Sequence, residues 1–153
     1  MSTYKVAIIM GSPNDRPKME PAAETLSGFG IEADVRVMSA HRTPAKVAGF
    51  VGSARAEGYS AVIAGAGMAA HLAGAAAAHT TLPVVGVPLS GGAIGGVDAL
   101  YSTVQMPKGI PVATVAVDGA INAALLVVQM LAIGDSDLES ALVADREARA
   151  SVT

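Results

Sequence analysis

Three short loops hold the residues of this sequence whose types and spacing suit chemistry. The richest is the stretch SAHRTP, which begins at Ser39. Thr43 and Pro44 account for the start of a helix, as its N-cap and its first helical residue. Ser39, His41 and Arg42 are then not needed for capping. Histidine transfers protons near neutral pH, and the planar guanidinium of arginine suits a phosphate or a carboxylate. The loop therefore predicts acid–base chemistry on an anionic ligand.

The second loop, MGSPNDRP, follows an apolar run and opens a helix. Gly11 permits tight backbone geometry, and Ser12, Asn14 and Asp15 are natural cap residues. The backbone N–H groups at a helix start suit an anion. The loop is therefore either a cradle for a phosphate or ribose phosphate, or an ordinary helix cap. It is not a P-loop, because the pattern G-x-x-x-x-G-K-[ST] is absent.

The third loop, GAGMAAH, formally matches the dinucleotide fingerprint G-x-G-x-x-[GA]. That fingerprint also requires an acidic residue about 20 positions further on. No acidic residue occurs between Glu57 and Asp98, so we do not expect NAD. The same geometry lets a smaller ligand approach the backbone, with His71 on the first turn of the next helix. Taken alone, His71 fits a partly buried structural histidine better than a catalytic one, and His79 is interpreted as structural.

Apolar runs alternate with helical patterns along the chain, which predicts the frame that positions these loops. Near-continuous apolar runs are typical of strands buried on both faces, and the second run alternates more, as near a sheet edge. We expect strands at 4–10, 31–38, 60–66, 83–89 and 110–117, and helices at 18–29, 43–58, 68–79, 97–106, 119–132 and 135–150. The alternation predicts a three-layer α/β/α, flavodoxin-like open parallel sheet of about five strands in the order 2-1-3-4-5. In such folds ligands bind beyond the carboxyl ends of the strands, where the winding reverses. The three loops should therefore meet in one crevice.

Composition excludes several classes of function. The chain has 153 residues, a formal net charge of −3 and no cysteine. Disulfides, thiolate metal sites and a cysteine nucleophile are therefore excluded, and three scattered histidines do not predict a metal site. Without a basic patch we expect no nucleic acid partner. The N-terminal apolar run is too short for a signal peptide, so we expect a cytoplasmic protein with no membrane association.

The segment from Gly58 to Val97 contains no Asp, Glu, Lys or Arg. Glycine, proline and histidine interrupt its apolar runs before they could span a membrane. The segment either forms central strands and a buried helix, or packs in part against other copies of the chain, and we expect a homo-oligomer.

We expect residues 1–133 to form a single α/β nucleotide-binding catalytic domain. Residues 134–153 should form a C-terminal helix that belongs to this domain or packs on a neighbouring subunit.

Several motifs, in order over about residues 4–133, resemble one family. They are MGSPND, VRVMSAHRTP, IAGAGMAAHLAG, PVVGVPL and VDALYSTVQMPKGIPVATVAV. This set is similar to the 5-(carboxyamino)imidazole ribonucleotide mutase family of purine biosynthesis, the mutase branch of the AIR carboxylase family. A related branch carboxylates aminoimidazole ribonucleotide directly with CO2. That branch typically carries AHK and AGRSN where this chain has AHR and AGAGM.

The resemblance implies a reaction and a set of residues. A carboxylate moves from the exocyclic nitrogen of the imidazole ribonucleotide to ring carbon C4, through trapped CO2 and with no metal or organic cofactor. His41 would be the general acid and base, and the family implies a homo-octamer with sites at subunit contacts. The residues implied to bind substrate are Ser12, Asn14, Asp15, Ser39 and Arg42 for ribose and phosphate, and Gly67, Ala70, His71 and Leu72 for the base and CO2.

The chain departs from the family pattern at a few positions. Asn14 replaces a usual serine, Met68 replaces a usual glycine and Ala73 replaces a usual proline, and the stretch AVDGAINAAL is shorter than usual. Two other interpretations stay open at this point. One is direct CO2-dependent carboxylation of aminoimidazole ribonucleotide, and the other is a nucleotide-binding paralogue without activity.

Overall fold

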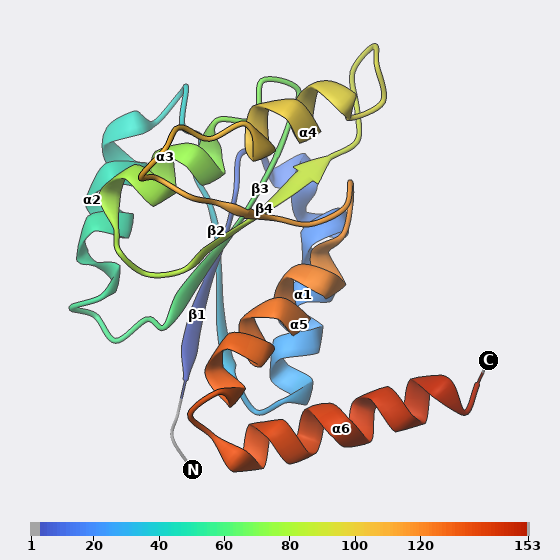
Figure 1. Ribbon diagram of the computed structural model, residues 1–153. Helices are drawn as coiled ribbons and strands as arrows, with labels where there is room; N and C mark the ends of the chain where they lie inside the picture. The colour runs from blue at the N-terminus through green and yellow to red at the C-terminus, as the bar shows by residue number, and fades with distance from the viewer. Residues whose placement is uncertain (1–3, 153) are drawn as a thin grey trace.

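A computed structural model describes residues 4–152, and it places a parallel sheet between two layers of helices (Figure 1). Residues 1–3, at the start of the predicted catalytic domain, lie outside the described residues, as does residue 153, at the end of the predicted C-terminal helix. The strands are β1 (Lys5–Met10), β2 (Glu32–Val37), β3 (Ala61–Gly67), β4 (Val84–Leu89) and β5 (Ala113–Thr114). The helices are η1 (Pro13–Asp15), α1 (Arg16–Gly28), α2 (Pro44–Ala54), α3 (Leu72–His79), α4 (Val97–Val104), α5 (Ala120–Ala132) and α6 (Ser136–Ala150). None of these helices is long and apolar enough to cross a membrane.

The strand order β2-β1-β3-β4-β5, with every pair parallel, confirms the predicted sheet. Ile8 in β1 pairs with Val35 on one side and with Ile63 on the other. Every residue of β4 is buried, whereas the β2 sequence EADVRV is only partly buried. The weaker apolar character of β2 therefore follows from its place at the edge of the sheet.

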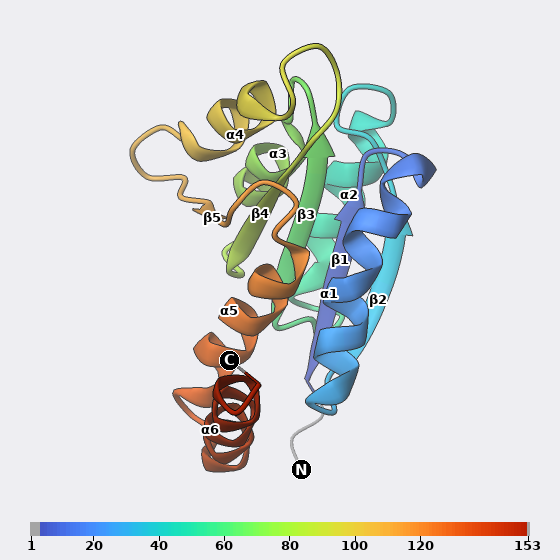
Figure 2. The ribbon, with the colours of Figure 1, turned by 90° about the vertical axis from the view of Figure 1, so that its right-hand side faces the viewer.

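Each face of the sheet is covered by its own helices (Figure 2). Helices α1 and α5 form one apolar layer with the sheet, while α2 and α3 form the other. Small residues allow close contact between layers. Gly86 in β4 leaves room for the side chains of Thr103, Val112 and Ala73, and a Cβ there would lie 2.9 Å from Val112 and 3.1 Å from Ala73. The glycines in the strands are thus packing requirements.

Several predicted elements are shorter in the structure, and the helix expected at 43–58 ends at Ala54. The helix expected from residue 68 begins only at Leu72, because the chain first makes two tight turns, with Ala70 N–H donating to Met68 C=O and His71 N–H to Ala69 C=O. The strand expected at 110–117 is reduced to Ala113–Thr114. The chain then pairs irregularly with β4 and inserts one extra residue, as in a β-bulge.

The C-terminal helix α6 contacts α5 at its start and then leaves the body of the protein. Leu138 is buried in the core that α1 and α5 form, and Leu142 packs against that core. Figure 1 shows the far end of α6 projecting away from the sheet. Only the first turns of α6 therefore belong to the core of this chain.

Candidate active site

A cleft of about 400 Å³ lies beyond the carboxyl ends of β1, β2 and β3. All three chemically interesting loops contribute to it, as expected for the point where the winding of the sheet reverses. The lining residues are Gly11, Ser12, Asn14, Asp15, Ser39, Ala40, His41, Arg42, Ala66, Gly67, Met68, Ala69, His71 and Leu72. Two hollows of similar volume, beside α6 and below β4, contain no histidine. The chemistry of the side chains therefore identifies this cleft as the candidate site.

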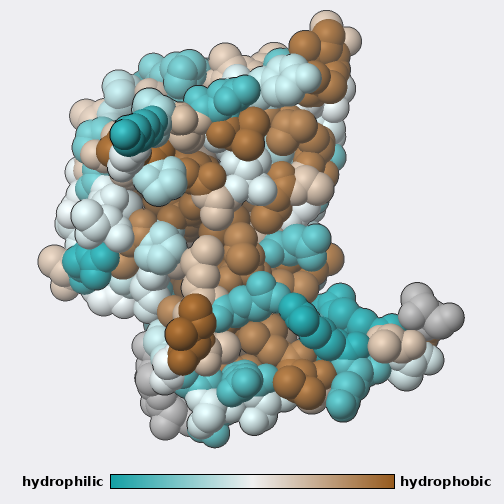
Figure 3. Space-filling model, in the orientation of Figure 1, coloured by the Kyte–Doolittle hydropathy of each residue, from teal (hydrophilic) through white to brown (hydrophobic). Residues whose placement is uncertain are grey.

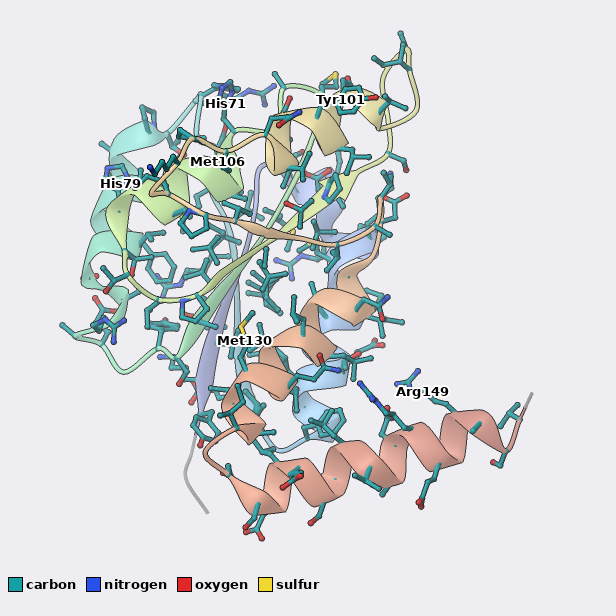
Figure 4. All side chains as sticks on the ribbon, viewed as in Figure 1. His71, His79, Tyr101, Met106, Met130 and Arg149 are labelled. Atoms are coloured by element: carbon teal, nitrogen blue, oxygen red, sulfur yellow. The ribbon has the colours of Figure 1, made fainter. Side chains whose placement is uncertain are left out.

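Two histidines from different loops meet in the cleft. His41 Nε2 lies 2.8 Å from His71 Nδ1, and the two rings are nearly perpendicular, with an interplanar angle of 78°. Both side chains are exposed, and Figure 4 shows His71 at the edge where the strands end. One nitrogen must donate and the other accept, so the pair shares one proton in this bond. Such a pair can deliver a proton to a ligand in the cleft and take one back.

The loop SAHRTP is held by hydrogen bonds within itself, and Thr43 and Pro44 begin the helix as predicted. Thr43 occupies the N-cap position of α2, but its side chain makes no capping bond. Its hydroxyl instead accepts from Ser39 N–H at 2.9 Å and donates to Ser39 C=O at 3.0 Å. The Ser39 hydroxyl accepts from Arg42 N–H at 3.1 Å. Ser39 is therefore part of the turn that presents His41 and Arg42.

The loop MGSPND is a capping box. Ser12 Oγ accepts from Asn14 N–H at 3.2 Å, and the Asp15 carboxylate accepts from Ser12 N–H at 3.1 Å. The backbone N–H of Arg16 donates to Pro13 C=O, so these amides already have partners. Of the two alternatives for this loop, the structure favours the ordinary helix cap over a cradle of free backbone N–H groups, because the box consumes these groups. Side chains remain as the donors for an anion.

The charges of the cleft favour an anionic ligand near one end. The Arg42 side chain is exposed and forms no hydrogen bond or ion pair with any residue in the described part of the chain. Its guanidinium is thus available to a phosphate. Burial raises the pKa of Asp15, opposed by the Ser12 amide and by the positive charge of Lys18. Asp15 stays close to the cleft as a hydrogen-bond acceptor that suits a ribose hydroxyl.

The structure corrects one predicted site residue and adds others. Ala70 is 1% exposed and does not line the cleft. Its N–H instead closes the turn after β3. Met68 and Ala69, which precede it, do line the cleft, as do Gly11, Ala40 and Ala66. For most of these additional cleft residues, the only signal in the sequence is that they are small and lie next to a predicted loop.

A polar cluster that the sequence did not predict lies beside the site. Lys18 Nζ donates to Ser90 C=O and to Ser90 Oγ at 2.7 Å, and lies 3.8 Å from the Asp118 carboxylate. Asp118 accepts from both Ser90 N–H, at 2.8 Å, and Ser90 Oγ–H. The cluster ties α1 to the loops after β4 and β5. No three His, Asp or Glu side chains among residues 4–152 are arranged to hold a metal ion.

Comparison with known proteins assigns the family. The family model described as AIR carboxylase matches residues 5–151. The chain belongs to the AIR carboxylase family. The N5-carboxyaminoimidazole ribonucleotide mutase of Brucella melitensis is 53% identical over 146 residues, which cover 94% of this chain and 90% of that protein. The protein of the same name from Escherichia coli is 52% identical, over 90% of this chain and 83% of that protein.

A solved structure agrees with the sequence comparison. The crystal structure of Treponema denticola PurE superposes with a TM-score of 0.87 at 30% identity, and covers 96% of this chain and 92% of that chain. The similarity spans nearly the whole chain. The likeness to this solved structure agrees with the sheet and the helical layers described above.

Proposed function

We propose that this chain is an isomerase that converts 5-(carboxyamino)imidazole ribonucleotide into 4-carboxy-5-aminoimidazole ribonucleotide in purine biosynthesis. The proposal is supported by two relatives that carry the mutase name and share about half of their residues with this chain. The observation that carries the mechanism is the hydrogen-bonded pair of His41 and His71 inside the cleft.

The reaction moves one carboxylate and one proton in opposite directions. The bond between the exocyclic nitrogen and the carboxylate carbon breaks, its electron pair stays on nitrogen, and CO2 is released into the cleft. The nitrogen takes up a proton and becomes an amine. Ring carbon C4 then attacks CO2 with electrons that the amine feeds into the ring, and the C4 proton is lost. Substrate and product therefore carry the same number of protons, and one acid–base group can serve both steps.

His41 is the group that gives the first proton and takes the second. It lies in the cleft at the end of β2, and its Nε2 faces His71 at 2.8 Å. The second imidazole holds the ring of His41 in place and can keep the exchanged proton inside the cleft between the two half-reactions. No step of this scheme requires a metal ion or an organic cofactor.

The remaining side chains of the cleft bind the nucleotide. Arg42, without a partner elsewhere in the described chain, holds the phosphate together with the hydroxyls of Ser12 and Ser39. The side-chain amide of Asn14 adds a further donor and the Asp15 carboxylate accepts from the ribose. Gly67, His71 and Leu72 form the wall against the base and CO2, and Ala70 fixes the turn behind them.

Substitution of His41 tests the proton transfer. In His41→Asn the new amide can still bond to His71 but cannot carry a proton, so turnover should fall by about 10²–10⁴-fold. Binding of the product nucleotide, measured by calorimetry, should change little. His79→Asn is the matched control, because His79 lies outside the cleft and bonds to Ala75 C=O. A His41→Asn protein that turned over at the parent rate would refute the assigned role.

The substrate test separates isomerase from carboxylase. The protein is given 5-(carboxyamino)imidazole ribonucleotide without added bicarbonate, and in parallel aminoimidazole ribonucleotide with bicarbonate. We expect product only in the first assay at enzymatic rates. Product only in the second assay would establish direct carboxylation, and product in neither, with the nucleotide still bound, would establish a binding protein without activity.

We further propose that the chain assembles into a homo-octamer. Val97, Tyr101 and Val104 are spaced to share one face of α4, and all three are exposed. Tyr101, labelled in Figure 4, is 62% exposed. Figure 3 shows hydrophobic surface over α4 and the preceding loop, which includes Ile94. An apolar face of this kind is suited to contact with another copy.

We also propose where the C-terminal helix packs and where in the cell the enzyme works. Residues 1–133 form the catalytic domain, and the projecting end of α6 packs on a neighbouring subunit, because little of it is covered by its own chain. The enzyme works in the cytoplasm, where a phosphorylated nucleotide is retained because its charge opposes membrane crossing.

A further inference from the structure

Met68 holds an unfavourable backbone conformation at the edge of the cleft. Its φ is +52°, in the left-handed region that a residue with a Cβ rarely adopts. Its C=O accepts the Ala70 N–H in the turn that leads to His71. Glycine would take this conformation without strain. A residue kept in such a conformation beside a site points to a role for its side chain there.

Burial does not compensate for this strain. Met68 is 59% exposed, and it is the only large apolar side chain among the described cleft residues that is exposed. Leu72, the other large apolar side chain in the cleft, is buried. The remaining apolar wall consists of alanines and glycines. Met68 therefore supplies the bulk at the open side of the cleft.

The loop after β4 is matched to this side chain. Figure 2 shows that loop arching over the ends of the strands. Gly92 lies in it with φ +64°, and a Cβ on Gly92 would lie 3.1 Å from Met68 Cγ and 3.4 Å from Met68 Sδ. The absence of a side chain at 92 thus leaves space for Met68. The thioether bridges the loop after β3 and the loop after β4.

We propose that Met68 covers the cleft and retains released CO2 until C4 is carboxylated. This inference rests on the proposed function. CO2 is small, neutral and apolar, so charged groups such as Arg42 hold it poorly. Its retention depends on apolar walls and on the exclusion of water. A flexible methionine adapts to a ligand surface.

Isotope exchange measures this retention. Unlabelled substrate is converted in buffer with ¹³C-bicarbonate and carbonic anhydrase, and ¹³C in the product carboxylate is read by mass spectrometry at early times. The parent should incorporate little label, because the original CO2 is recaptured. Met68→Ala and Met68→Gly should incorporate several-fold more label per turnover. Met68→Leu, which keeps the apolar volume, should behave like the parent.

A stability measurement separates the effect of the Met68 side chain from the effect of its backbone conformation. Met68→Gly should melt about 2–4 °C above Met68→Ala, because only glycine relieves the left-handed strain. Equal labelling in the parent and in both truncated variants would overturn the role of Met68 while leaving the isomerase intact. A parent that labels every product molecule, or converts no substrate, would overturn the proposed function and this inference with it.

Discussion

Asp118→Asn should destabilise the protein by removing a single charge from the cluster beside the site. Asp118 has φ +58°, and asparagine tolerates that left-handed conformation. The substitution therefore leaves the backbone in place. The amide oxygen of asparagine can still accept Ser90 N–H, but the Ser90 hydroxyl and Lys18 lose their charged partner.

The magnitude follows from the two lost charged contacts. A hydrogen bond to a charged group contributes about 1.5–3 kcal/mol when it is buried. The Asp118 side chain is 38% exposed, as is that of Lys18, and exposed ion pairs contribute only about 0–1 kcal/mol. We therefore expect the free energy of unfolding to fall by about 1–2 kcal/mol. The melting temperature should fall by about 2–4 °C for each kcal/mol.

The effect should depend on pH with a defined sign. Burial opposes ionisation of Asp118, but the hydrogen bonds from Ser90 and the charge of Lys18 lower its pKa below the ordinary value. A carboxyl whose pKa is lower in the folded state stabilises the fold above its unfolded pKa of about 3.9. That contribution is lost as the pH falls through the folded pKa. The gap between parent and variant should therefore be constant near neutral pH and close in acid.

Urea denaturation followed by far-UV circular dichroism provides the assay, since the chain contains no tryptophan for fluorescence. Protein concentration must be held fixed, because assembly raises apparent stability. Asp118→Ala is the matched variant, and it should lose more than Asp118→Asn because it adds backbone strain. A gap between parent and Asp118→Asn that persisted unchanged in acid would refute the electrostatic reasoning.

Three further predictions address binding, packing and assembly. Arg42→Ala should weaken binding of the product nucleotide by about 10–100-fold in calorimetry. The control Arg55→Ala should not, because Arg55 is exposed just after the end of α2. Equal affinity of the parent and of Arg42→Ala for the nucleotide would refute the phosphate contact. Gly86→Ala should lower the free energy of unfolding by about 1–3 kcal/mol in urea through overpacking, while Gly49→Ala, with open space in a helix, should raise it slightly. Tyr101→Glu should reduce the mass measured by light scattering to that of smaller species, and an unchanged mass would exclude α4 from the contact.

The sheet could be predicted because its signal is local and repeated. Buried strands such as β1 and β4 are continuous apolar runs, and the alternation in β2 marks an edge. The strand order and the convergence of three loops then follow from the rules of parallel α/β folds. The fifth strand was predicted too long, because its pairing with β4 depends on a bulge that the apolar pattern conceals.

The interior of the site was less predictable, because it depends on contacts between distant segments. His41 and His71 are 30 residues apart, and only the fold brings their nitrogens to 2.8 Å. Thr43 begins α2 as predicted, but its hydroxyl and that of Ser39 bond within the turn, because cap residues bond equally well to a neighbouring turn. Lys18, Ser90 and Asp118 come from three separate segments, and no short motif marks such a cluster.

Among residues 4–152, Met68 and Asp118 are the residues other than glycine that have a left-handed backbone conformation. Both contact the loop that follows β4. Met68 meets that loop at Gly92, and Asp118 binds it at Ser90. Four of its glycines have positive φ, so the loop has little intrinsic preference for one shape. Two external contacts two residues apart supply the shape instead. The strain at Met68 and Asp118 is therefore the cost of fixing a permissive loop beside a cleft, and the fold tolerates it because the buried sheet provides the stability.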